Sequence, residues 1–242
     1  MALLKTLKRI FNQTLLRCLD SEKCIRDIQY AERFRSAILD SPWLLRQNFL
    51  LSGWAIDYCG LFHCFRILEK LQPAKIVEFG IGESTKMFSQ YVDYHAGTQL
   101  LTFEHDPIWI DVFRQSPANH DKNCNIVECP LETVSFRGTS TLRYAGDMGE
   151  YTGDQIELIF LDGPRGFDLS YARTQILDLI PDHLNRDKFC IIIHDYHRKG
   201  EKNTAKMVME KLDAAKIACK TNDYHGMNGM LMIVPERYGF LT

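Results

Sequence analysis

KIVEFGIGEST, at residues 75–85, joins a short β-rich run to a glycine loop and a helix start. The run ends near the acidic Glu78, and the glycines allow the backbone to approach a ligand that the free N–H groups of the next helix can bind. Nicotinamide dehydrogenases carry a third glycine where Thr85 stands here, and an acid before the first glycine suits a positively charged amine better than a pyrophosphate. The alternative is a set of tight-turn glycines that hold no ligand. The candidate ligand contacts in this stretch are Glu78, Gly80, Gly82, Ser84 and Thr85.

Working outward from this stretch, short β-rich runs alternate with helical ones, which is typical of βαβ units in a parallel sheet. We predict strands at 75–79, 99–104, 124–128, 156–161, 189–193, 215–220 and 229–234. We predict helices near 84–94, 107–115, 168–184 and 202–214. The expected fold class is α/β: a Rossmann-like, doubly wound, seven-stranded and mostly parallel sheet with an antiparallel last strand, plus an N-terminal helical extension.

The N-terminal extension is expected to be helical at 1–20, 22–39 and about 43–71, where Pro73 ends it. We therefore divide the chain into an extension at 1–72 and a ligand-binding domain at 73–242. The first helix is amphipathic and basic, and three interpretations stay open for it: docking on its own domain or a partner subunit, which makes a homodimer plausible, peripheral contact with a membrane surface, or a disordered tail.

Residues 134–153, rich in Gly, Ser and Thr, predict a long loop or small hairpin before the fourth strand. An insertion of this length in a compact domain is a candidate substrate lid.

The 242 residues carry a formal net charge of −2, so no global field draws the chain to nucleic acid. The eight cysteines form no C-x-x-C pair and follow no zinc-ligand spacing, which favours reduced, buried thiols over disulfides. We find neither a convincing signal peptide nor an apolar run long enough to span a bilayer. The expected compartment is the cytoplasm, with membrane association through residues 1–20 left open.

A second acidic residue, Glu104, ends the next predicted strand. It lies 26 positions after Glu78, close to the spacing at which nucleoside-binding α/β proteins place a carboxylate against the ribose hydroxyls. His105 follows where an adenine edge would lie. The alternative is that Glu104 caps the helix that opens at Asp106-Pro107.

With these two sites in order, residues 73–235 resemble the class I S-adenosylmethionine (SAM) dependent methyltransferases. The resemblance rests on E-x-G-x-G-x-S-T at 78–85, the acid Glu104, IFLDGP at 159–164 and IIIHDY at 191–196. It implies SAM as cofactor, with Glu78 near the methionine end, the glycine loop along it and Glu104 on the ribose.

A third group of polar residues follows the fourth and fifth predicted strands: Asp162, His194 and Asp195. If these strands are neighbours, the three side chains converge at the carboxyl edge of the sheet, where open α/β folds bind substrates. They form either a general-base pair, in which an aspartate orients His194 to take a hydroxyl proton, or a site for a divalent cation such as Mg²⁺. Metal-dependent O-methyltransferases look similar here, but the chain has Asp162-Gly163-Pro164 where they carry Asp-x-Asp.

DGPRG at 162–166 also resembles the D-x-P-R-G of plant glucuronoxylan O-methyltransferases, which methylate a sugar acid. Arg165 would suit a carboxylate or phosphate on the substrate, or it is a solvated residue of a turn. Tyr196 and His197 extend the candidate substrate site, and His225 is a further candidate. The absence of an N-P-P-Y type sequence favours oxygen over nitrogen as the methyl acceptor.

The sequence therefore predicts a SAM-dependent O-methyltransferase that acts on a polar small molecule or a sugar. Two alternatives stay open: a nicotinamide-dependent oxidoreductase on a similar fold, and a non-catalytic module that docks on a membrane or an assembly through its N-terminal helix.

Overall fold

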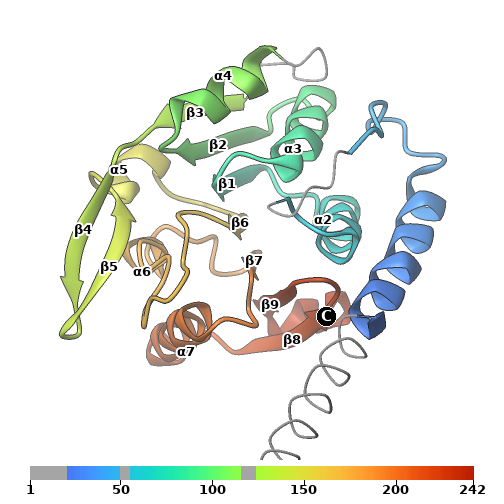
Figure 1. Cartoon of the computed structure of the whole chain (residues 1–242). Helices are drawn as coiled ribbons and strands as arrows, with labels where there is room; N and C mark the ends of the chain where they lie inside the picture. The colour runs from blue at the N-terminus through green and yellow to red at the C-terminus, as the bar shows by residue number, and fades with distance from the viewer. Residues whose placement is uncertain (1–20, 50–54, 116–123) are drawn as a thin grey trace, which may run out of the picture.

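The computed structural model describes residues 21–49, 55–115 and 124–242 (Figure 1). The helix expected for residues 1–20 lies outside these ranges, so the interpretations of it stay predictions. None of the described helices is both long and apolar enough to cross a membrane.

A seven-stranded sheet forms the centre of the molecule, in the order β3-β2-β1-β6-β7-β9-β8. The strands pair in parallel from β3 to β7, while β9 runs antiparallel to both β7 and β8. The predicted doubly wound sheet with an antiparallel last strand is confirmed. The strands are β1 (Lys75–Phe79), β2 (Gln99–Glu104), β3 (Cys124–Glu128), β6 (Leu158–Leu161), β7 (Cys190–His194), β8 (Cys219–His225) and β9 (Gly229–Pro235).

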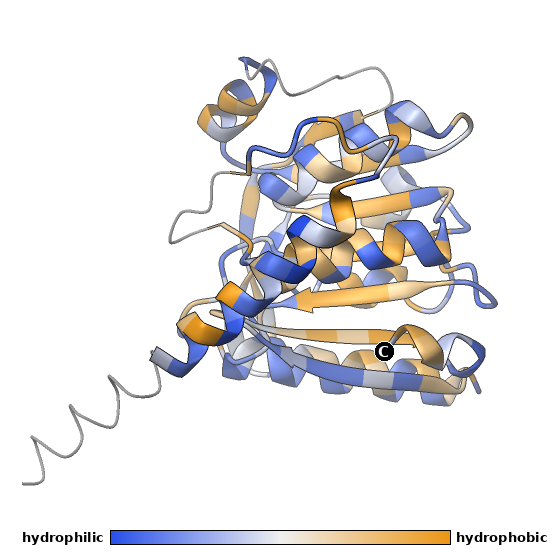
Figure 2. Ribbon diagram, turned by 90° about the vertical axis from the view of Figure 1, so that its right-hand side faces the viewer, coloured by the Kyte–Doolittle hydropathy of each residue, from blue (hydrophilic) through white to orange (hydrophobic). Residues whose placement is uncertain are grey.

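Both faces of the sheet are covered, because alternate residues of the central strands are apolar on each side. Leu158, Phe160 and Ile192 face a core shared with α2, α3 and residues 34–44. Ile159, Leu161 and Ile193 face a second core on the side of α6 and α7. Figure 2 shows these strands as hydrophobic ribbons between helices whose outer sides are hydrophilic.

The helices differ from the prediction at two places. The helices of the described residues are 21–38, α2 (Tyr58–Leu71), α3 (Glu83–Tyr94), α4 (Pro107–Gln115), α5 (Met148–Thr152), α6 (Ile176–Leu179), α7 (Lys199–Ala214) and the 3-10 helix η1 (Glu236–Leu241).

The predicted helix at 43–71 is wrong in its first part, because residues 43–49 are irregular. The N–H of Arg46 donates to the Gln90 side chain of α3 instead of to a helical carbonyl. The helix proper starts after Asp57, whose side chain accepts the N–H of Gly60 as an N-cap.

The predicted helix at 168–184 is also wrong, since only Ile176–Leu179 is helical. Asp168 and Arg173 have positive φ angles of 59° and 58°, which interrupt a helix, and Pro181 follows. The apolar residues that suggested the helix are buried in a mostly irregular segment. They are Ala172 and Ile180 on either side of α6, and Ile176, Leu177 and Leu179 within it.

The strand predicted at 215–220 starts too early, because β8 is Cys219–His225, whereas the strand predicted at 229–234 agrees with β9. The polar residues 221–225 belong to β8 and not to the reversal, which is confined to Gly226–Asn228. An edge strand tolerates these polar residues because one of its edges is open.

The insertion before β6 is a two-stranded hairpin, as one of the two predictions for 134–153 had it. Its strands are β4 (Leu131–Phe136) and β5 (Thr139–Tyr144), and α5 follows. In Figure 1 the hairpin projects from the side of the sheet near α6.

Candidate active site

The carboxyl ends of β1, β2, β6 and β7 meet at one edge of the sheet. In the parallel register Phe79 pairs with Phe103 and Leu161, and Leu161 pairs with Ile193. The residues that follow in each strand are therefore neighbours, so the predicted glycine loop, the acid of β2 and the polar cluster lie along the same edge.

The glycine loop packs against the backbone of Gly163 at Gly80 and faces open space at Gly82. Gly80 has a φ of +97°, its N–H donates to the carbonyl of Phe103, and a Cβ there would lie 3.2 Å from the nitrogen of Gly163. A Cβ on Gly82 would meet nothing within 4 Å. The loop thus needs glycine at position 80, whereas at position 82 it leaves room in front of the N-terminus of α3.

Glu78 faces the inside of the protein. It is fully buried, and it accepts hydrogen bonds from the Ser84 hydroxyl at 2.6 Å and the Thr102 hydroxyl at 3.0 Å. Burial raises the pKa of Glu78 to about 8, although the hydroxyls of Ser84, Thr85 and Thr102 act against this rise. Thr85 also accepts the N–H of Gly82 at 2.9 Å. Glu78, Ser84 and Thr85 therefore hold the shape of the loop from within.

Glu104 joins the loop to the end of β2. Its Oε2 accepts the N–H of Ile81 at 2.9 Å, and its Oε1 accepts the N–H groups of His105 at 2.6 Å and Asp106 at 2.9 Å. The Nδ1 of His105 lies 2.7 Å from the same Oε1. Glu104 does not cap α4, because the N–H of Ile108 in the first turn donates to the Asp106 side chain at 2.9 Å. A carboxylate with about four lone-pair sites retains acceptor capacity for a ligand.

Tyr144 of β5 is a residue that the sequence did not single out. Its ring stacks near Phe79 and Phe103, and its hydroxyl is buried without a hydrogen-bond partner. The hydroxyl lies against Gly163 and close enough to Glu104 for that charge to raise its pKa, after burial itself. Because a buried polar atom without a partner is unusual, this hydroxyl marks the edge between β1, β2 and β6 as a place for a ligand.

Asp162 and His194 form a hydrogen-bonded pair at the ends of β6 and β7. The Nδ1 of His194 lies 3.0 Å from Asp162 Oδ1, while its Nε2 is buried and has no partner. Burial opposes protonation of His194, but the carboxylates of Asp162 and Asp195 more than offset it and raise its pKa to about 9. The Oδ1 of Asp195 is 4.0 Å from the same Nδ1.

Arg173 is a second residue that the sequence did not reveal. Its side chain is buried, with Nη2 lying 2.8 Å from Asp195 Oδ2 and 3.2 Å from Asp162 Oδ1. No local pattern could have identified it, because its partners are remote in sequence and it falls in the segment predicted as a helix. A single arginine within an apolar stretch is the only trace of its burial.

Asp162, His194 and Asp195 lie together as predicted, and one potential ligand atom of each falls within 4.8 Å of the others. The arrangement does not fit a divalent cation, however. The guanidinium of Arg173 already contacts both carboxylates, and Arg198 Nη1 lies 2.7 Å from Asp195 Oδ2. A metal ion would have to displace these charges or lie beside them.

The predicted substrate residues surround this cluster with different exposure. Arg165 is exposed, and no ion pair is recorded for it within the described part of the chain. Tyr196 is half-buried, and its N–H donates to the carbonyl of Gly229 at 2.9 Å. His197 is exposed as a residue, but its Nδ1 accepts the N–H of Gly229 at 3.4 Å, and partial burial of the ring lowers its pKa. His225 is exposed and lies 3.6 Å from Asp223.

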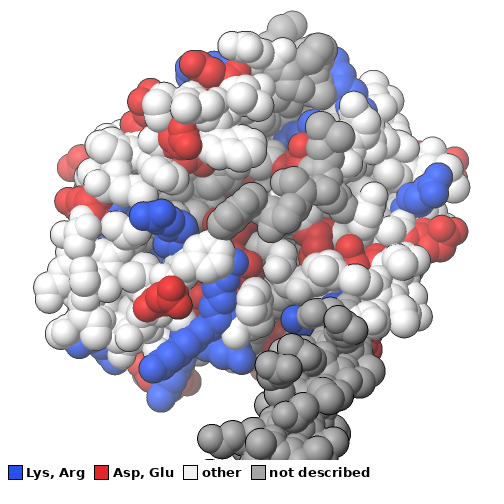
Figure 3. Space-filling model, viewed as in Figure 1, with Lys and Arg blue, Asp and Glu red and all other residues white. Residues whose placement is uncertain are grey.

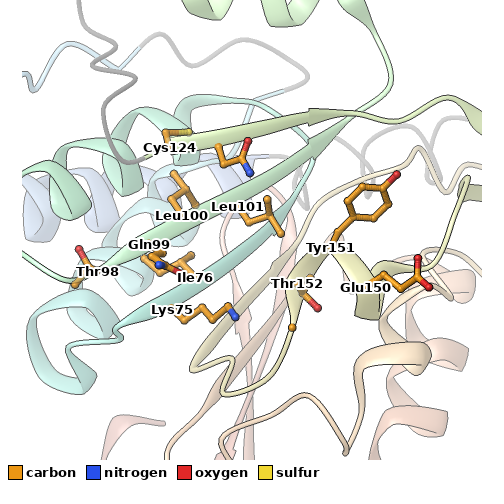
Figure 4. A pocket seen from close by; sticks show the side chains of 12 residues that line it. Lys75, Ile76, Thr98, Gln99, Leu100, Leu101, Cys124, Glu150, Tyr151 and Thr152 are labelled. Atoms are coloured by element: carbon orange, nitrogen blue, oxygen red, sulfur yellow. The ribbon is translucent and has the colours of Figure 1, made fainter.

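One cavity lies away from this edge. It has a volume of about 610 Å³ and lies at the opposite ends of the strands, since Lys75, Gln99 and Cys124 are the first residues of β1, β2 and β3 (Figure 4). Residues 150–153 line its other side. It belongs to the face of the sheet beside α5 and contains none of the predicted site residues.

Known structures share this architecture, although no family profile and no curated protein matches the sequence. An O-methyltransferase from Bacillus cereus in complex with SAH is 14% identical, with 87% of this chain and 90% of that chain covered and a TM-score of 0.52. The O-methyltransferase TomG from Streptomyces achromogenes, involved in tomaymycin synthesis and in complex with SAM, is 12% identical over 87% and 89%, with a TM-score of 0.51. A putative O-methyltransferase from Klebsiella pneumoniae is 14% identical over 87% and 89%, with a TM-score of 0.50.

The chain therefore has the fold of the class I SAM-dependent methyltransferases, as its sequence motifs predicted. With sequence identities of only 12–14%, the structural similarity shows the fold alone. The reaction and its substrate have to be argued from the site.

Proposed function

We propose that this protein is a SAM-dependent O-methyltransferase. The observation that carries the proposal is the Asp162–His194 pair, with one imidazole nitrogen held by a carboxylate and the other buried without a partner. It lies at the same sheet edge as the open glycine loop, which is where this fold binds ligands.

The residues along β1 and β2 fit SAM. The open space at Gly82 would receive the methionine part, and Glu104 would accept from the ribose hydroxyls with His105 beside the adenine. The Tyr144 hydroxyl offers a hydrogen bond that nothing in the described protein satisfies. When bound, SAM supplies a methyl group on a positively charged sulfur, which a nucleophilic oxygen can attack.

His194 is the proposed general base. Asp162 holds Nδ1, so the proton of an acceptor hydroxyl would move to Nε2. A pKa of about 9 means that the ring is mostly protonated at neutral pH without ligands, while any positive charge brought to this edge lowers that pKa and favours the neutral base. General-base catalysis at this atom would contribute on the order of 10²–10⁴-fold.

Asp195 acts in this proposal as the second carboxylate of the catalytic group. It contacts Arg173 and Arg198, and its charge supports protonation of His194. It would therefore stabilise the imidazolium that forms when the acceptor hydroxyl loses its proton.

The proposed acceptor is a polar small molecule or a sugar. The exposed guanidinium of Arg165 suits a carboxylate or phosphate on that molecule, and Tyr196 and His197 would complete its site. The hairpin β4–β5 is the proposed lid. Lys and Arg are interspersed with Asp and Glu on the face drawn in Figure 3, which does not favour a polyanion such as nucleic acid. We also propose a cytoplasmic location. It is supported by the seven cysteines of the described residues, which are all free thiols, as is usual for proteins of a reducing compartment.

The test is methyl transfer from labelled SAM to a panel of hydroxylated sugars and sugar acids. His194→Ala should lower kcat by at least 10²-fold with unchanged SAM affinity, whereas Glu104→Ala should weaken SAM binding. Asp182→Asn, at an exposed surface ion pair with Arg186, is the matched control and should change neither. Equal losses of turnover and SAM affinity in His194→Ala would contradict the proposed role.

A further inference from the structure

The guanidinium of Arg173 is the best-connected buried charge at the proposed active site. Nη1 donates to the carbonyls of Leu161 at 3.1 Å and His194 at 2.8 Å, which are the last residues of β6 and β7. Nε donates to the carbonyl of Pro164 at 3.2 Å. With Nη2 on Asp162 and Asp195, one side chain ties together the two strands that present the proposed base and its partner.

Three carboxylates and a second arginine, Arg198, surround Arg173 in a network of charges. Glu201, fully buried, adds a third carboxylate, and its Oε1 lies 3.8 Å from Arg173 Nε and 3.8 Å from Arg198 Nη1. Arginine stays protonated at all accessible pH values, so the space between Asp162 and Asp195 permanently holds a positive charge. Each of these three carboxylates has one oxygen within 3.8 Å of a nitrogen of Arg173.

A divalent cation shared by Asp162 and Asp195 would need an oxygen of each carboxylate at about 2.0–2.6 Å. Asp162 Oδ1 already has His194 and Arg173 as neighbours, and Asp195 Oδ2 has Arg173 and Arg198. A bound metal would lie against at least one guanidinium. Moving Arg173 aside would leave a buried arginine with only carbonyl acceptors, which is costly.

We propose that Arg173 takes the place of a divalent cation between Asp162 and Asp195, so that the site works without a metal. Arg173 is a positioning residue: it fixes the two carboxylates and the ends of β6 and β7, and through them His194. Its part in methyl transfer rests on the proposed function, but its occupation of the cation position does not.

The test is binding of Mn²⁺ to the full-length, EDTA-treated protein, measured by electron paramagnetic resonance. Wild type should show no Mn²⁺ site with a Kd below 1 mM. Arg173→Ala, which uncovers two carboxylates, should bind Mn²⁺ at least tenfold more tightly than wild type, and Arg173→Lys, which keeps the charge, should not. Arg198→Ala is the matched control, because it removes the other arginine from Asp195 and leaves Arg173 in place, and it should show no gain.

A micromolar Mn²⁺ site in wild type that Asp162→Asn abolishes would overturn the proposal. That measurement decides the matter even if Arg173→Ala does not fold. Where an acceptor is known, the proposal predicts turnover that EDTA leaves unchanged, and in Arg173→Ala a recovery of kcat on addition of guanidinium. A protein that binds neither Mn²⁺ nor SAM would contradict the methyltransferase proposal while leaving this one standing.

Discussion

Replacing Asp162 with Asn should remove the pH dependence that the Asp162–His194 pair gives to the stability of the fold. In the native protein the pKa of His194 is raised from its ordinary 6.5 to about 9, against the effect of burial and because of Asp162 and Asp195. A raised pKa stabilises the fold fully below pH 6.5, and this contribution is lost as the pH rises through about 9. Asn keeps the shape of the side chain but not its charge.

The magnitude follows from the two pKa values. The difference between about 9 and 6.5 corresponds to roughly 3 kcal/mol of unfolding free energy, at about 1.36 kcal/mol for each pH unit. In Asp162→Asn the pKa of His194 should fall to 6.5 or lower, because burial is no longer offset by its nearest carboxylate. The stability gap between wild type and variant should therefore shrink by about 3 kcal/mol from pH 6 to pH 9.5. Loss of the contact with Arg173 adds a term that does not vary over this range.

Urea unfolding of both proteins at pH 6 and pH 9.5 measures this gap, and groups common to both proteins cancel in the difference. The matched control is Asp154→Asn, which removes the carboxylate from a surface pair with His183. Because the Asp154 side chain is 71% exposed, this change should alter stability by less than about 0.5 kcal/mol. An Asp162→Asn gap that stays constant with pH would refute the coupling of the two residues.

Three further predictions concern the loop and the cofactor edge. Gly80→Ala should lower the free energy of unfolding in urea by about 1–3 kcal/mol, because φ is +97° and the new Cβ would lie 3.2 Å from the nitrogen of Gly163. Gly82→Ala should change stability by less than about 0.5 kcal/mol but weaken SAM binding, because its methyl group would fill the open space. Glu78→Gln should become more stable relative to wild type, by a few kcal/mol in thermal unfolding, as the pH rises from about 4.5 to 8, since burial raises the pKa of Glu78 to about 8 and its ionisation then destabilises the fold. Tyr144→Phe should leave stability unchanged within about 1 kcal/mol, because its hydroxyl has no partner, yet lower SAM affinity about fivefold or more in calorimetry; equal SAM affinity would show that the hydroxyl faces no ligand.

Much of the fold could be predicted because the decisive signals are local. The strands at 75–79, 99–104 and 124–128 agree with the structure residue for residue, since a glycine or proline lies within two residues of each. The antiparallel last strand followed from the short polar segment before it. The order β3-β2-β1-β6-β7-β9-β8 depends on pairings remote in sequence, and the sequence analysis did not predict it.

The errors arose where tertiary contacts override a local pattern. Residues 168–184 have helical spacing of apolar side chains, but Arg173 adopts a positive φ to reach Asp162 and Asp195, and the chain follows it. The same contact is why the candidate site was incomplete. Asp162, His194 and Asp195 could be grouped from their positions at strand ends, whereas the arginine that binds them, and Tyr144 of the hairpin, have no sequence signal.

Whether the edge formed by the glycine loop and the end of β2 binds SAM can be measured directly by calorimetric titration. The purified protein is titrated with SAM and with its demethylated product SAH, and the titrations are repeated with EDTA and with Mg²⁺. We expect micromolar binding of both SAM and SAH, unchanged by EDTA or Mg²⁺. Binding should be lost in Glu104→Ala, because the Glu104 carboxylate holds the glycine loop through the N–H of Ile81. Absence of binding under all of these conditions, with the protein folded, would contradict the assignment of this sheet edge to SAM.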